Sequence, residues 1–203
     1  MNTLIRTIEV LGIIAFALTG FYAARKKGMD LIGVYSLGMV TALGGGSLRD
    51  ILLNRHPLFW MEHYEYAILL LALSITSSLV AQEFFERKSM VHVVLALDAL
   101  GLGSFSASGA SLADQQGCAL FISSLLGVIT GVFGGVMRDI VSNELPYVFQ
   151  RTELYATCSF IGAWTYLLVV RNSGNDIVAA TACIAVTFVM RVIALRYKIK
   201  LPI

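Results

Sequence analysis

Residues 41–57 read TALGGGSLRDILLNRHP, and residues 130–146 read TGVFGGVMRDIVSNELP. The two stretches share Thr, Gly-Gly, Arg-Asp, Asn and Pro at the same spacing, 89 residues apart. A merely apolar composition would not match glycines, prolines and charged residues in this way. The chain therefore contains a repeat, and each copy holds a glycine run followed by an Arg-Asp pair.

The repeat extends beyond these two stretches without a gap. Further positions that recur 89 residues later are Leu11 and Leu100, Gly12 and Gly101, Phe16 and Phe105, Gly20 and Gly109, Gly28 and Gly117, and Gly38 and Gly127. We expect a single membrane domain over residues 1–203. It would comprise repeat one at about residues 4–82, repeat two at about residues 91–171 and a seventh helix at about residues 176–196.

The composition indicates that lipid is the solvent for most of the chain. Of 203 residues, 57% are hydrophobic and 14% charged, and the mean hydropathy is +0.77, which is too apolar for one soluble core. The few basic residues form no continuous face, which argues against nucleic acid as a partner. The blocks long enough to cross a bilayer are 4–24, 31–53, 66–81, 91–110, 118–140, 154–170 and 177–195.

Three spans in each copy place the second copy in the membrane from the opposite side. The expected fold is therefore all-α: a polytopic membrane protein of seven transmembrane helices, built as two inverted three-helix repeats plus a C-terminal helix. With the N-terminus outside and the C-terminus cytoplasmic, eleven of the 15 Lys and Arg residues fall on the cytoplasmic side, as the positive-inside rule favours.

The glycine runs predict kinks in the second and fifth helices. Glycine costs about 1 kcal/mol relative to alanine inside a helix, so Gly44–Gly46 and the pair Gly134 and Gly135 should bend or unwind the backbone near mid-span. Carbonyl and amide groups freed in this way require a polar cavity. The alternative is that the glycines allow close packing of helices.

The charged residues inside the spans are the second candidate feature. Arg49 with Asp50, and Arg138 with Asp139, would lie at the two mouths of such a cavity. The alternative role is a structural ion pair, formed across the inverted repeat. Asp98 is a possible intramembrane acid, which either attracts cations or is protonated and hydrogen-bonded to a neighbouring helix.

An enzyme is not expected, because the chain has no HExxH helix, no P-loop and no Ser-His-Asp or Cys-His arrangement. Cys118, Cys158 and Cys183 lie in separate apolar blocks and are predicted to be free thiols. The first apolar block is interpreted as a retained helix rather than a signal peptide.

With GGGSLRD at residues 44–50 and GGVMRD at residues 134–139, the chain resembles the trimeric intracellular cation (TRIC) channel family, specifically its prokaryotic members. The resemblance covers essentially the whole chain. It implies a homotrimer in the prokaryotic plasma (inner) membrane, in which each subunit holds an hourglass pore for potassium and, less selectively, sodium. Membrane lipids are the other expected partners, with no protein partner and no cofactor besides the permeant cation.

The same resemblance assigns the site residues. Those expected to line the pore or bind the cation are Thr41, Gly44, Gly45, Gly46, Ser47, Thr130, Phe133, Gly134 and Gly135. The cation, potassium or sodium, would contact the kink carbonyls of Gly44, Gly45, Phe133 and Gly134. Phe133 departs from the second-helix motif, which has Gly44 at that position, so this half should be bulkier and less unwound.

Two alternatives remain open at this point. Inverted repeats with broken helices are equally typical of secondary transporters, here for glycine or another small amino acid. The second alternative is a membrane protein with a structural or scaffold role.

Overall fold

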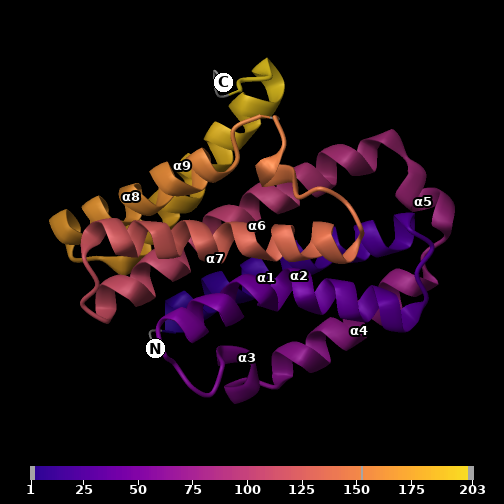
Figure 1. Cartoon of the computed structure of the whole chain (residues 1–203), viewed down its shortest axis with the longest axis horizontal. Coiled ribbons are helices and arrows are strands. Elements are labelled where there is room, and N and C mark those ends of the chain that lie inside the picture. Colours follow the sequence, from indigo (N-terminus) through magenta and orange to yellow (C-terminus); the bar gives the residue numbers. More distant parts are fainter. Residues whose placement is uncertain (1–2, 152, 201–203) are drawn as a thin grey trace.

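The computed structural model describes residues 3–151 and 153–200. Residues 1–2, 152 and 201–203, which the predicted domain included, lie outside the described residues. The described part folds as a bundle of helices, and its centre is formed by four long ones (Figure 1). These four are α1 (Thr3–Lys26), α2 (Leu31–Leu52), α6 (Lys88–Gln115) and α7 (Leu120–Val141).

The four central helices pack in a ring of neighbours. Helix α1 contacts α2 and α6, and α7 also contacts α2 and α6. Each repeat thereby contributes its first two long helices to the same core. The contact between α2 and α7 brings the two glycine motifs together.

The remaining helices cover this centre. Helix α4 (Glu65–Leu79) packs mainly on α2, whereas α8 (Ala156–Ser173) packs on α6, α7 and α9 (Asp176–Tyr197). In Figure 1, α4 lies on the opposite side of the bundle from α8 and α9. Short helices α3 (Phe59–Glu62), α5 (Gln82–Glu86) and η1 (Tyr147–Phe149) connect the long ones.

The turns after α2 and α7 have the same backbone shape. Asn54 and Asn143 adopt φ angles of 51° and 55°, a left-handed conformation that asparagine tolerates better than most residues. The next amides, of Arg55 and Glu144, each donate to an Asp carbonyl oxygen, of Asp50 and of Asp139, at 2.8 Å. The two asparagines therefore turn the chain in the same way after each helix.

Each of the seven predicted spans overlaps a helix, yet five of the helices in the described residues are long and apolar enough to cross a membrane. Helix α4 has 15 residues, which cover about 22 Å of a hydrocarbon core of about 30 Å. Helix α8 is not among the five candidate spans either. The described structure is therefore an all-helical membrane protein, and the count of seven spans stays a prediction.

The unwinding expected at the glycine runs does not occur. Helices α2 and α7 remain α-helical through residues 44–46 and 133–135. The physical reason is tertiary packing, since the glycines lie against neighbouring backbone and side-chain atoms that hold the helical conformation against its low intrinsic propensity. A bend without loss of the helix stays a prediction.

Candidate functional site

The two glycine motifs meet where α2 passes α7, and we call this meeting point the glycine crossing. A Cβ atom on Gly45 would overlap the carbonyl oxygen of Thr130, and a Cβ atom on Gly134 would overlap that of Thr41. The two contacts are equivalent under the repeat. Gly134 is the counterpart of Gly45, and Thr130 is the counterpart of Thr41, each 89 residues later. Glycine is required at both positions for this approach. Close packing therefore accounts for these two glycines.

Neighbouring glycines in the motifs have looser surroundings. A Cβ atom on Gly44 would lie 2.8 Å from the sulfur of Met137, a flexible side chain. One on Gly135 would have the hydroxyl oxygen of Tyr155 as its nearest atom, at 3.5 Å. Phe133, the bulky residue of the second motif, is half-buried.

The hydroxyl groups predicted to line the pore are engaged in hydrogen bonds. Thr41 and Thr130 each donate to a carbonyl oxygen one turn earlier in their own helix, at 2.6 Å. The hydroxyl of Ser47 donates to its own helix at 2.8 Å and accepts from the indole of Trp60 at 3.0 Å. These side chains hold the helices near the crossing in place.

On one side of the crossing, four buried side chains form the Arg49 cluster, which consists of Arg49, Glu9, Asp50 and Ser108. Arg49 donates to Asp50 at 2.9 Å, to Glu9 at 2.8 Å and to Ser108 at 2.9 Å. Ser108 also donates to Glu9 at 2.6 Å. The side chains of Arg49 and Glu9 are 0% exposed. Arg49, predicted to lie at a mouth of the cavity, is thus part of an interior ion pair. The ion pair forms within repeat one and not across the two repeats, and Ser108 contributes the hydrogen bonds from repeat two.

On the other side of the crossing lies the Arg138 cluster, which consists of Arg138, Asp98, Asp139 and Thr19. Arg138 donates to Asp139 at 2.9 Å, to Asp98 at 3.3 Å and to Thr19 at 3.2 Å. Every member is 89 residues from its counterpart in the Arg49 cluster. Here, however, the side chains of Arg138 and Asp98 are 16% and 9% exposed.

The Arg138 cluster faces a cavity of about 440 Å³, which we call the vestibule. Of the predicted site residues, Gly135, Arg138, Asp139 and Asp98 line it. The other predicted pore residues lie at the crossing or pack within the bundle. The structure therefore brings the two motifs together. A cavity borders the Arg138 cluster, whereas the Arg49 cluster is buried.

Aromatic and basic residues form another wall of the vestibule. Arg191, on α9, lies against the rings of Tyr155 and Tyr147, at 4.8 Å and 5.5 Å from their centroids. Tyr147 also donates to Glu153 at 2.6 Å. This hydrogen bond is the largest contribution that lowers the pKa of Glu153 below its usual value.

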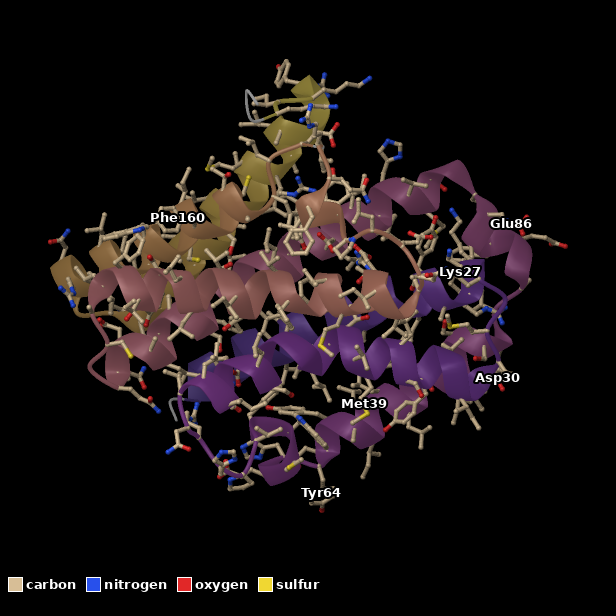
Figure 2. All side chains as sticks on the ribbon, in the orientation of Figure 1. Lys27, Asp30, Met39, Tyr64, Glu86 and Phe160 are labelled. Carbon is tan, nitrogen blue, oxygen red and sulfur yellow. The ribbon has the colours of Figure 1, made fainter. Side chains whose placement is uncertain are left out.

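The rim of the vestibule carries an exposed ion pair. Lys27 and Glu144 are 2.6 Å apart and both are partly exposed. Figure 2 shows Lys27 at the same end of the molecule as Asp30 and Glu86. The vestibule therefore lies at the end of the bundle where α1 ends at Lys26, next to Lys27.

Thr19 and Arg191 were not predicted from the sequence, and Ser108 was predicted only as one of several serines that line the path or join helices. Thr19 and Ser108 are hydroxyl residues 89 positions apart, so the repeat could have identified them as partners of the two arginines. Arg191 has no counterpart, because α9 lies outside both repeats. Its position inside an apolar segment was the one signal in the sequence.

Comparison with known proteins assigns the family. The family model described as "Glycine transporter" matches residues 6–82 and again residues 95–171. The UPF0126 inner membrane protein YadS of Escherichia coli is 35% identical over 201 residues, which cover 98% of this chain and 95% of the relative.

Solved structures agree with this assignment. The TRIC channel orthologue from Rhodobacter sphaeroides superposes with a TM-score of 0.88 at 32% identity, covering 98% of this chain and 100% of that one. A chain from a study of conductance through TRIC cation channels gives a TM-score of 0.85 at 38% identity, covering 98% and 96%. The chain therefore belongs to the TRIC channel family of membrane proteins, as a prokaryotic member.

Proposed function

We propose that this protein is a monovalent cation channel, permeable to potassium, whose route runs through each subunit past the glycine crossing. The observation that carries the proposal is that two charged clusters lie on either side of the crossing, one of them open to a cavity. The proposed pore residues are those predicted from the two motifs: Thr41, Gly44, Gly45, Gly46, Ser47, Thr130, Phe133, Gly134 and Gly135. Kinking of α2 and α7, and cation contact with carbonyls of the motifs, belong to the conducting state in this proposal.

The charge balance of the two clusters supports cations as the permeant ions. In the Arg138 cluster, one guanidinium faces the two carboxylates of Asp98 and Asp139, which leaves a formal excess of one negative charge. In the Arg49 cluster, Arg55 lies 3.7 Å from Asp50 and balances the second carboxylate. Neutralised arginines do not repel a cation, and an excess carboxylate attracts one.

The quaternary structure and placement are proposed from the family. The solved relatives are described as TRIC channels, and TRIC stands for trimeric, so we infer a homotrimer. The relative from E. coli is named an inner membrane protein, and we infer the same membrane here. The matching contacts of residues 89 positions apart support two inverted repeats. The positive-inside rule favours an N-terminus outside, and the vestibule then faces the cytoplasm.

The test uses purified protein in planar bilayers under asymmetric potassium chloride. A reversal potential near the potassium value supports the proposal, and one near the chloride value contradicts cation selectivity. No cofactor is added, since the permeant cation is the one small ligand proposed.

Transport of glycine is the second candidate, favoured by the description of the matching family model. A transporter would show saturable, gradient-driven uptake of labelled glycine into vesicles and no unitary currents. The two assays on the same preparation separate the candidates.

Replacing Asp98 with asparagine is expected to reduce the potassium conductance about twofold to fourfold in 0.1 M potassium chloride, because the Arg138 cluster loses its excess negative charge. The difference should nearly vanish at 1 M salt, where the Debye length is about 3 Å. Single-channel recording at both concentrations measures this.

The matched control is Asp114→Asn on the same helix. Asp114 forms an exposed ion pair with Arg171 at 3.2 Å and does not line the vestibule. The Asp114→Asn variant should have the same potassium conductance as the parent protein. An equal reduction in both variants would show that the Asp98 carboxylate has no local role.

A further inference from the structure

We propose that the ring of Phe59 and the carboxylate of Glu9 seal the Arg49 end of the route, while the Arg138 end is held open by Arg191. The inference rests on the proposed function and specifies how that route is closed. It follows from comparing the two clusters, which share the same residue types at positions 89 apart but differ in exposure.

The first difference is the length of the acid. Glu9 and Asp98 are equivalent positions, and the glutamate has one more methylene group. Its carboxylate reaches Arg49 at 2.8 Å and Ser108 at 2.6 Å. The shorter Asp98 lies 3.3 Å from Arg138. The Glu9 arrangement is tighter and leaves both side chains inaccessible to solvent.

The second difference is the aromatic ring next to the arginine. The backbone amide of Phe59 donates to Asp50 at 2.9 Å, and that of Tyr147 donates to Asp139 at 2.9 Å. The two amides therefore make the same contact, although the two residues are 88 and not 89 positions apart. The ring of Phe59 is buried and lies 5.2 Å from the guanidinium of Arg49. It therefore covers the cluster.

Tyr147 does not cover Arg138 in the same way. Its ring lies 5.5 Å from the guanidinium of Arg191 instead and packs against Tyr155. Arg191 is 1% exposed and is held by a hydrogen bond to the carbonyl oxygen of Leu154. Because α9 has no counterpart in the first repeat, no residue draws Phe59 away from Arg49 in this manner. The extra helix thus makes the two ends unequal.

The experiment measures access of water at the two ends by cysteine labelling, which needs no ion flux. Ala23→Cys places a thiol in the vestibule wall, and Ser108→Cys places one in the Arg49 cluster. A small, charged, water-soluble thiol reagent is applied to the purified full chain. The reactivity of the native thiols Cys118, Cys158 and Cys183 is measured in the parent protein and subtracted.

We expect the thiol at position 23 to react and the thiol at position 108 to react at least tenfold more slowly. Adding Phe59→Ala should raise the reactivity at position 108 at least tenfold and increase potassium flux. Phe59→Leu, which retains more apolar volume, should have a smaller effect in the same direction and serves if the alanine variant does not fold.

Phe85→Ala is the matched control, because Phe85 is also buried and also lies next to an arginine, 5.3 Å from the guanidinium of Arg25. It should leave position 108 protected. Equal reactivity at positions 23 and 108 in the protein with Phe59 intact would overturn the seal, as would deprotection by Phe85→Ala alone. If the labelling follows the expectation and no variant conducts ions, the seal stands and the channel proposal fails.

Discussion

Replacing Arg49 with methionine is expected to lower the free energy of unfolding by about 3–5 kcal/mol, the cost of leaving buried charges without their partner. Glu9 and Asp50 would lose their guanidinium in an interior where their side chains are 0% and 1% exposed. Water cannot reach them to compensate. The measurement is reversible unfolding in mixed detergent micelles, or the apparent Tm where unfolding is irreversible.

The equivalent variant in the other half is the control. Arg138→Met removes the same number of hydrogen bonds but leaves its two carboxylates beside the vestibule, where water can solvate them. We expect its effect to be smaller, roughly 1–2 kcal/mol, at the low end of the cost of leaving polar groups without their partner. Adding Glu9→Gln to Arg49→Met should restore part of the stability. An effect of Arg138→Met as large as that of Arg49→Met would contradict the difference in hydration.

Replacing Gly45 with alanine is expected to destabilise the protein by about 3 kcal/mol, because one methyl group would overlap the carbonyl oxygen of Thr130. A carbonyl oxygen of a packed helix cannot move aside unless the whole of α7 shifts. For a chain of this size the apparent Tm should fall by about 10 °C. Gly134→Ala should have a comparable effect through Thr41.

Gly135→Ala in the same motif is the control. Its added methyl group would have an ordinary contact of 3.5 Å with Tyr155, and alanine favours the helix by about 1 kcal/mol. Stability should be unchanged or slightly higher. If Gly45→Ala were as stable as Gly135→Ala, the close approach at the crossing would be wrong.

The family and the positions of the long helices could be predicted from the sequence, because the Gly and Arg-Asp residues recur at the same spacing in both copies of the repeat. The structural role of the glycines could not be predicted from the sequence. Gly45 alone is equally compatible with a broken helix and with a close crossing, and the choice depends on Thr130, which lies far away along the chain. Local propensity favours the break, whereas the tertiary contact preserves the helix.

The partners of the arginines were predictable only in part. The adjacent residues Asp50 and Asp139 do form ion pairs with Arg49 and Arg138, but each pair lies within one repeat and not across the two. The different exposure of the two clusters was not foreseen. In the proposal above, it depends on the direction in which Phe59 and Tyr147 point, and Tyr147 lies against Arg191 of α9.

The glycine crossing has a mechanical consequence. Where the backbones of two helices touch at one point, one helix can tilt as a rigid body about that point. Tilting α2 about this point would widen one end of the route while narrowing the other. Tilting of this kind would open the two ends of the route alternately, which is the alternating access that a secondary transporter requires. A route open at both ends therefore requires a movement other than rigid tilting: kinking of α2 and α7, displacement of the side chains at the closed end, or both.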